Sequence, residues 1–223
     1  IHDVALQNLP VIFCLDRAGL VGEDGATHHG VFDIAYLNCI PNLLIAAPKD
    51  EIELRNLLFT ASEGLNHPIA IRYPRGRGEN VHWQQPFEKI EVGKITQLQK
   101  GTKVAILSTG TIGNNVTKAL AETENSSLFS HYHFPFVKPL DIKEISKIIV
   151  SYDYIITIEE GVITGGFGEQ INSIMIRQNL QKPLKNLGIP DFFVEHGTVF
   201  ELQQLCKIDV IHLIQLFNTF QHD

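Results

Sequence analysis

Three short apolar runs, separated by segments with helical patterns, constrain the fold of the first 80 residues more than any other feature. Residues 11–15, 43–48 and 69–73 are mostly apolar and short, which is typical of buried strands. Residues 31–39 predict a short helix, and Asp50 is a candidate N-cap for another. This alternation of strands and helices predicts an α/β fold in which helices cover a parallel sheet.

A polar stretch broken by glycine, from Arg75 to about Gln85, predicts a linker between two units. We therefore expect one domain at residues 1–80 and a second at residues 86–223. Strand and helix patterns alternate again in the second domain, which is also predicted to be α/β. The strands expected there are 103–108, 127–134, 154–158 and 184–188, and the helices are 113–122, 142–149, 169–177, 198–206 and 209–220.

Residues 16–30 directly follow the first expected strand and carry most of the chemistry in the sequence. They contain four glycines, one arginine, three acidic residues and two adjacent histidines. Ligands of open α/β sheets bind at the carboxyl ends of the strands. We therefore predict that this segment is a functional loop.

Arg17 and Arg75 follow the first and third expected strands. Because parallel strands end at the same edge of a sheet, the two guanidinium groups can converge on one phosphate or carboxylate. The alternative for Arg17 is a solvated side chain or an ion pair with Asp16 or Asp24. The sequence leaves both interpretations open.

His28 and His29 lie side by side in the same loop. Adjacent histidine side chains diverge, and neither HxH nor HExxH spacing is present, so no metal ligand is expected. An imidazole titrates near neutral pH, so one of the two could donate a proton or a hydrogen bond to a substrate oxygen. The alternative is a loop histidine held by Asp24 or by backbone atoms.

Other polar or glycine-rich motifs are predicted to be structural. Residues 165–168 predict a tight turn that packs a helix onto its strand rather than a phosphate site. Lys138 is expected to be solvated or ion-paired, and His196 to be structural or interfacial. The three cysteines have no CxxC spacing and predict buried free thiols in a reducing compartment. They are Cys14, Cys39 and Cys206.

Charge and hydropathy exclude two classes of partner. The net charge of −7 argues against a surface that binds nucleic acid. No apolar run approaches the roughly 20 residues that a membrane helix needs. Residues 1–7 resemble the middle of a helix and lack the basic start of a signal peptide, so we expect a cytoplasmic protein that acts on small molecules.

Taken together, these motifs resemble the 1-deoxy-D-xylulose-5-phosphate synthases, a family of transketolase-like thiamine diphosphate enzymes. The resemblance covers nearly the whole chain. It is closest in the Asp-Arg-Ala-Gly-Leu-Val-Gly element and in the Asp-Gly-Ala-Thr-His element that follows it. The matching segments are 16–22, 24–28, 32–37, 70–76, 136–141, 165–168 and 187–191.

The resemblance implies a partial pyrimidine-binding domain followed by a transketolase C-terminal domain. It implies an enzyme that condenses pyruvate with glyceraldehyde 3-phosphate to 1-deoxy-D-xylulose 5-phosphate, with release of carbon dioxide, for isoprenoid and thiamine synthesis. In that enzyme Arg17 and Arg75 would bind the acceptor phosphate, and His28 would be the catalytic residue that assists proton movement. Asp24 would support the loop. His29 lies where the family is less uniform and is given no role.

The resemblance also implies thiamine diphosphate and Mg²⁺ in the full-length enzyme. The sequence contains neither the GDG element that holds the diphosphate nor the Gly-Ile-Ala-Glu-Gln type segment that activates the pyrimidine. We therefore expect a C-terminal fragment that binds neither group, is inactive alone, and has a sheet edge that is exposed or covered by a partner. No cofactor-binding residue is assigned.

Two other functions stay open at this stage. The β subunit of a 2-oxo acid dehydrogenase shares both domain types, although the Asp-Arg-Ala-Gly element favours the synthase. A non-catalytic dimerisation module is the third interpretation. We expect the chain to form a homodimer.

Overall fold

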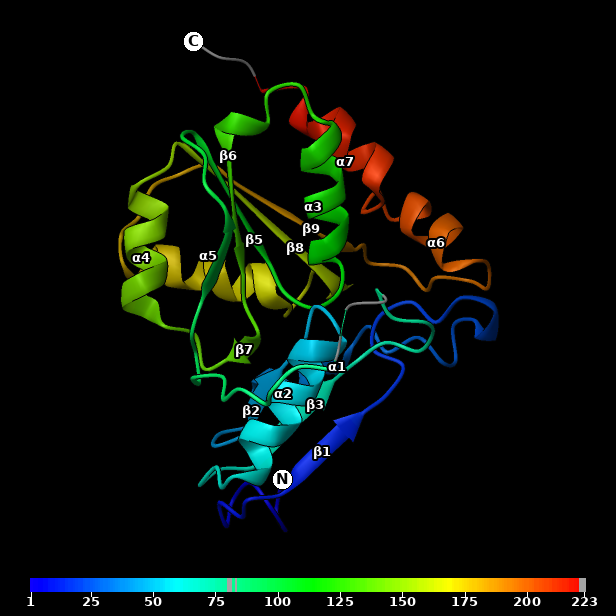
Figure 1. The fold of residues 1–223 in the computed structure, drawn as a ribbon, viewed down its shortest axis with the longest axis vertical. Coiled ribbons are helices and arrows are strands. Elements are labelled where there is room, and N and C mark those ends of the chain that lie inside the picture. The colour runs from blue at the N-terminus through cyan, green and yellow to red at the C-terminus, as the bar shows by residue number, and fades with distance from the viewer. Residues whose placement is uncertain (80–81, 83, 221–223) are drawn as a thin grey trace.

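The computed structural model describes residues 1–79, 82 and 84–220 and contains two sheets that lie end to end (Figure 1). The first sheet has the order β1-β3-β2-β7. β3 pairs in parallel with β1 and β2, whereas β7 pairs antiparallel with β2. These strands are β1 (Ile12–Leu15), β2 (Leu44–Ala46), β3 (Ile69–Arg72) and β7 (Phe136–Lys138).

The second sheet has the order β4-β6-β5-β8-β9. β6, β5, β8 and β9 are parallel, and only β4 runs antiparallel to its neighbour. The strands are β4 (Thr96–Gln99), β5 (Val104–Ser108), β6 (Phe129–His133), β8 (Tyr154–Val162) and β9 (Leu184–Ile189).

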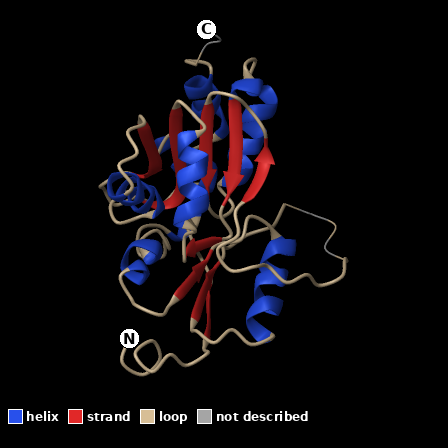
Figure 2. Ribbon diagram, turned by 90° about the vertical axis from the view of Figure 1, so that its left-hand side faces the viewer, coloured by secondary structure: helices blue, strands red, loops and turns tan. Residues whose placement is uncertain are grey.

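Helices cover both faces of the second sheet (Figure 2). Val104 and Ile106 of β5 belong to the same buried cluster as α3 and α7 residues, while Ala105 and Leu107 pack with α4 and α5. Successive strand residues point to opposite faces, so a strand covered on both sides is apolar throughout. The helices are α1 (Asp33–Asn38), α2 (Glu51–Ser62), α3 (Gly113–Glu122), α4 (Ile142–Val150), α5 (Phe167–Arg177), α6 (Val199–Leu205) and α7 (Val210–Phe217).

The carboxyl ends of the two sheets meet in the middle of the molecule. The Gly110 N–H, just after β5, donates to the carbonyl of Ala47, just after β2, at 3.2 Å. The Ala47 N–H in turn donates to the carbonyl of Pro135 at 2.9 Å. This junction brings the segments that follow β1, β3, β5 and β8 into one region, which is where parallel sheets bind ligands.

The structure confirms the predicted parallel pairing of β1, β3 and β2 but differs from the prediction in several places. β4 and β7 were not predicted, because both are short antiparallel additions without a long apolar run. The strand expected at 127–134 begins with a 3₁₀ turn, η2 (Ser126–Leu128), before β6. Residues 2–8 form turns rather than helix.

β1 lies at the edge of its sheet, and the prediction that it is buried was wrong. Ile12 and Phe13 are 37% and 39% exposed. An edge strand has a neighbour on one side only, which agrees with the expected open edge. Cys14, on β1, and Cys39, at the end of α1, are also exposed, so the expectation of buried thiols holds only for Cys206. None of the described helices is long and apolar enough to cross a membrane.

Candidate functional site

The loop predicted to be functional is closed at its base by backbone hydrogen bonds. The N–H of Gly19 donates to the carbonyl of Gly30 at 2.8 Å, and the Gly30 N–H donates back at 2.9 Å. A Cβ at Gly30 would lie 2.2 Å from the Arg17 carbonyl oxygen, so only glycine fits there. Arg17 itself has a φ of 62°, and the next N–H, that of Ala18, donates to the Tyr73 carbonyl. The loop is therefore fixed to the ends of β1 and β3.

The structure brings Arg17 and Arg75 together on one carboxylate. Inside the loop a short 3₁₀ turn, η1 (Gly22–Asp24), directs Asp24 back toward the strand ends. The Asp24 Oδ2 atom lies 3.5 Å from Arg17 Nη1 and also accepts a hydrogen bond from Arg75 Nη1. The two arginines predicted to converge thus meet at the carboxyl ends of neighbouring strands. Asp24 is the anion that they hold here.

These three side chains form a charged surface that solvent can reach. The side chains of Arg17, Asp24 and Arg75 are 38%, 29% and 52% exposed. The hydrogen bond from Arg75, with the positive charges of Arg75 and Arg17, holds the pKa of Asp24 below its usual value. Asp24 is therefore a carboxylate at neutral pH. Another anion that reached the two guanidinium groups would compete with it.

His28, in the same loop, is exposed. Its backbone N–H donates to the carbonyl of Gly25, which closes a turn, and its Nδ1 atom lies 3.0 Å from Thr27 Oγ1. Its charge is one of the nearby groups that lower the pKa of Asp24. Among the described residues, the Nε2 atom of the imidazole has no hydrogen-bond partner, so it is available to a ligand.

His29 is a structural residue of the loop. It is 8% exposed, its Nδ1 atom accepts from the Val21 N–H at 3.1 Å, and its Nε2 atom lies 3.2 Å from the Glu195 carbonyl. These partners require the neutral tautomer with the proton on Nε2. The alternative of a histidine held by backbone atoms therefore describes His29. His196 is exposed, and its Cβ lies 3.3 Å from the position of a Cβ at Gly25.

Sequence reasoning missed a buried charge cluster behind the loop. The guanidinium of Arg72 contacts Asp33 and the backbone carbonyls of Gly30 and Glu160. The Glu160 side chain is buried and accepts from Gln203 Nε2 at 2.8 Å. The sequence does not indicate that the arginine at the end of this strand points inward. Its burial becomes evident only when Asp33 is known to be its partner.

Glu159, also missed, caps helix α5 from inside the core. Its two carboxyl oxygens accept from the N–H groups of Phe167 and Gly168 at 2.8 and 2.9 Å. Burial raises the pKa of Glu159 to about 7, although the two N–H groups oppose this. A Cβ at Gly168 would lie 2.4 Å from Thr157 Oγ1, so the glycine turn does pack the helix onto β8. The helix N-terminus is occupied by a carboxylate.

Lys138 is partly buried and, among the residues that the structure describes, is bound to backbone carbonyls and not to an acid, which corrects the prediction. Its ammonium group donates to the carbonyls of Asn38 and Ile40, at 2.9 and 2.5 Å. Burial lowers its pKa. The side chain therefore ties β7 to the end of α1.

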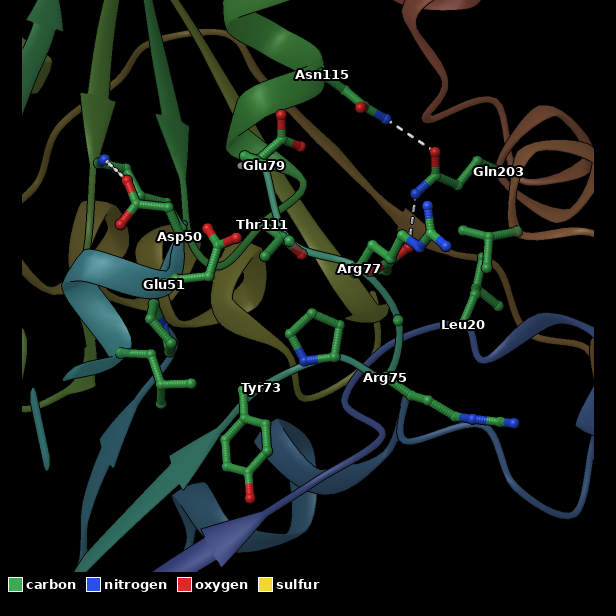
Figure 3. Close-up of a pocket in the computed structure, with 18 residues that line it drawn as sticks. Leu20, Asp50, Glu51, Tyr73, Arg75, Arg77, Glu79, Thr111, Asn115 and Gln203 are labelled. Atoms are coloured by element: carbon green, nitrogen blue, oxygen red, sulfur yellow. Dashed lines mark hydrogen bonds and ion pairs between the residues drawn. The ribbon is translucent and has the colours of Figure 1, made fainter. Parts of the chain in front are cut away.

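A cleft of about 470 Å³ lies between the two sheets, next to the charged loop (Figure 3). Asn115 of α3 donates to Gln203 Oε1 at 2.9 Å, and Gln203 of α6 donates to Glu160 of β8. These two hydrogen bonds link α3, α6 and β8 along one wall of the cleft. The lining residues are Leu20, Pro48, Lys49, Asp50, Glu51, Leu54, Tyr73, Pro74, Arg75, Gly76, Arg77, Gly78, Glu79, Thr111, Asn115, Glu160, Val199 and Gln203.

Two family patterns match the chain in the order of its two sheets. Residues 1–79 match the pyrimidine binding domain of transketolase. Residues 93–213, more than half of the chain, match the transketolase C-terminal domain. The chain belongs to the transketolase family. This agrees with the α/β fold expected from the sequence.

Two curated relatives within this transketolase group carry the same name. The 1-deoxy-D-xylulose-5-phosphate synthase of Bacteroides thetaiotaomicron is 51% identical over 211 residues, which cover 94% of this chain and 33% of that protein. The synthase of Parabacteroides distasonis is 49% identical over 210 residues, again 94% and 33%. The chain thus spans about a third of the length of the curated relatives it matches.

A solved transketolase structure has the same fold. It is a split-gene transketolase described as an inactive tetramer of four beta chains. The TM-score is 0.80 and the sequence identity is 21%. The match covers 99% of this chain and 70% of that one. At this identity the likeness concerns the fold.

The described residues show no ready-made ligand set for the magnesium ion of a transketolase cofactor. Within residues 1–79, 82 and 84–220, no three His, Cys, Asp or Glu side chains are grouped to hold a metal ion. Asp24 is engaged by two arginines, and the Glu159 carboxylate by helix N–H groups. We therefore derive no chemical step through that cofactor from this chain.

Proposed function

We propose that this chain is the acceptor-binding part of a 1-deoxy-D-xylulose-5-phosphate synthase. The enzyme would join pyruvate to glyceraldehyde 3-phosphate and release carbon dioxide. The observation that carries the proposal is the convergence of Arg17 and Arg75 at the ends of β1 and β3. The names of relatives that are 49–51% identical support the same activity.

Arg17 and Arg75 bind the phosphate of the acceptor aldehyde in this proposal. Two guanidinium forks fit the oxygens of a phosphate dianion better than one ammonium group would. Asp24 pairs with both arginines when no ligand is bound and moves away from them when phosphate binds. It therefore keeps both side chains extended toward the site.

His28 acts on the carbonyl end of the same acceptor. When the aldehyde carbon forms its new carbon–carbon bond, the aldehyde oxygen becomes a hydroxyl and takes up a proton. An exposed imidazole four residues after Asp24 is placed to donate that proton or a hydrogen bond. His29 is kept for positioning, since both of its nitrogens have backbone partners.

The groups that bind the diphosphate and Mg²⁺, and the segment that activates the pyrimidine, belong in this proposal to the part of the enzyme beyond these two domains. The cofactor supplies the electron sink that pyruvate decarboxylation needs. This chain holds the second substrate. We expect the isolated chain to bind neither thiamine diphosphate nor Mg²⁺ and to be inactive.

We also propose a homodimer located in the cytoplasm. The split-gene transketolase with this fold is described as a tetramer of β chains, which supports self-association. Three cysteines without disulfides suit a reducing compartment. The net charge of −7 suits small-molecule substrates better than nucleic acid.

The test is an assay of the enzyme that contains this chain, with pyruvate, thiamine diphosphate, Mg²⁺ and either glyceraldehyde 3-phosphate or glyceraldehyde. We expect 1-deoxy-D-xylulose 5-phosphate and carbon dioxide, with a much higher kcat/KM for the phosphorylated aldehyde. Transfer of the acyl group to a lipoyl carrier instead would assign the chain to the 2-oxo acid dehydrogenases. Equal use of both aldehydes would remove the phosphate role of the arginines.

A titration calorimetry experiment on the 223-residue chain tests the cofactor assignment separately. No heat with thiamine diphosphate and Mg²⁺ is the expected result. Micromolar binding would mean that this chain contains a diphosphate site, and the division of roles proposed here would be wrong.

A further inference from the structure

The side chain of Arg72 is a buried fork that joins three parts of the molecule. Arg72 ends β3, three residues before Arg75, and is only 4% exposed. Its Nε atom donates to Asp33 Oδ2 at 2.7 Å. Its Nη2 atom donates to the carbonyls of Gly30 and Glu160 at 3.0 and 3.2 Å.

Each acceptor belongs to a different structural element. Asp33 is the first residue of α1, and it is 7% exposed. Gly30 closes the base of the loop that contains Arg17 and His28. Glu160 lies on β8 of the second sheet. One side chain therefore holds the loop, the helix that follows the loop, and the second sheet at fixed relative positions.

The chemistry of the fork requires arginine. A planar guanidinium has five N–H donors in fixed directions, whereas a lysine ammonium is a compact point charge on a flexible stem. A buried cation is tolerated only when it is paired and its donors are satisfied. Lysine at position 72 could keep the charge beside Asp33 but would not reach the two carbonyls in the same geometry.

The contact with Gly30 links Arg72 to the phosphate-binding arginine. The Gly30 carbonyl accepts hydrogen bonds from Arg72 and from the Gly19 N–H. The backbone of Arg17 lies directly against the Cα atom of Gly30. Arg17 also has left-handed backbone, which is unfavourable for a residue with a side chain and persists only where the surroundings fix it. A shift at Gly30 is therefore passed directly to Arg17.

We propose that Arg72 is a positioning residue that, with Asp33, sets the placement of Arg17 and His28 for the phosphorylated acceptor. This inference rests on the proposed function and deepens it. Arg72 is too buried to touch substrate, so its effect passes through the loop base.

The experiment compares two aldehydes in the enzyme that contains this chain. Arg72→Lys and Asp33→Asn are assayed with glyceraldehyde 3-phosphate and with glyceraldehyde, at saturating pyruvate and well below the unfolding temperature. We expect the ratio of kcat/KM for the phosphorylated over the unphosphorylated aldehyde to fall by at least about 10-fold in Arg72→Lys, because small displacements of binding groups have large kinetic effects. Asp33→Asn should lower the ratio less, since it keeps the shape of the partner.

A matched control separates positioning from stability. His133 is fully buried and pairs with Glu53 at 2.7 Å between β6 and α2, away from the loop. His133→Leu should lower the unfolding temperature without changing the aldehyde ratio. A general loss of folded enzyme would lower kcat for both aldehydes equally.

The outcomes distinguish this inference from the function beneath it. A wild-type enzyme that uses both aldehydes equally would overturn the phosphate clamp itself. A wild-type preference that both Arg72→Lys and Asp33→Asn retain in full would overturn only the positioning role of Arg72. If Arg72→Lys does not fold, Asp33→Asn alone decides, because it removes the charge partner of Arg72 and keeps the Oδ1 atom that accepts from the Ile34 N–H.

Discussion

The Asp24 carboxylate accepts a hydrogen bond from the Arg75 guanidinium, and this bond is the largest cause of the lowered pKa of Asp24. The same oxygen lies 3.5 Å from Arg17. The pair of arginines is thus neutralised in part by a group of the protein itself. A substrate phosphate must compete with that carboxylate for the same donors.

Removing the charge of Asp24 should therefore strengthen the binding of phosphate. In Asp24→Asn, we expect the inhibition constant of inorganic phosphate to fall by about 2- to 5-fold, the usual scale of an exposed ion pair. Inhibition of the enzyme at fixed glyceraldehyde 3-phosphate measures it. Weaker phosphate binding would instead mean that Asp24 mainly organises the loop.

Arg17→Ala should raise the KM for glyceraldehyde 3-phosphate far more than the KM for pyruvate. The loss of one charge-assisted contact corresponds to about a 10- to 150-fold change. Lys143→Ala, an exposed cation on α4, is the control for a general loss of positive charge. Equal effects of Arg17→Ala on both substrates would contradict the phosphate role.

His28→Asn should lower kcat while leaving the KM for the aldehyde nearly unchanged. Loss of a general acid or base typically reduces turnover by about 10²- to 10⁴-fold. Steady-state kinetics at varied glyceraldehyde 3-phosphate and saturating pyruvate measure both constants. An unchanged rate would show that His28 has only a structural role in the loop, where its backbone N–H donates to the carbonyl of Gly25.

The sequence was sufficient to predict the parts of the site that follow strands. Residues 11–15 and 69–73 have the apolar pattern of parallel strands, so the positions of Arg17 and Arg75 at one sheet edge followed from topology. Asp24 was named, together with Asp16, as a possible partner for Arg17 because both acids lie close to it in the sequence. The placement of the two arginines needs only the order of elements and the rule that ligands bind at the carboxyl ends of strands.

The parts that were missed depend on side-chain direction in three dimensions. Arg72 and Asp33 are 39 residues apart in the sequence, and each alone has the appearance of a solvated charge. His29 differs from His28 only in that its ring turns inward to backbone partners. No local pattern fixes these directions, because they depend on how β8 packs against α1 and the loop. Short antiparallel strands such as β7 were not predicted for a similar reason, because they are defined by their pairing with another strand and not by their composition.

Glu159 makes the stability of the enzyme dependent on pH. Its pKa is raised to about 7 in the folded chain, from an ordinary value of 4.5, and desolvation by burial is the main cause. Between these values the folded state binds more protons at this site than the unfolded state does. Its contribution to stability is therefore fully present below about pH 4.5 and is lost as the pH rises through about 7, on the order of 3 kcal/mol. Thermal unfolding of the enzyme across this range measures the effect.

The variant Glu159→Gln cannot ionise, so its unfolding temperature should change less between pH 4.5 and 7.5 than that of the wild type. Some dependence should persist, because burial also raises the pKa of Glu160. Glu122→Gln, at an exposed position of α3, is the matched control and should keep the wild-type slope. If Glu159→Gln also keeps that slope, the buried carboxyl that caps α5 is ionised throughout the range, and its two N–H partners outweigh the cost of burial.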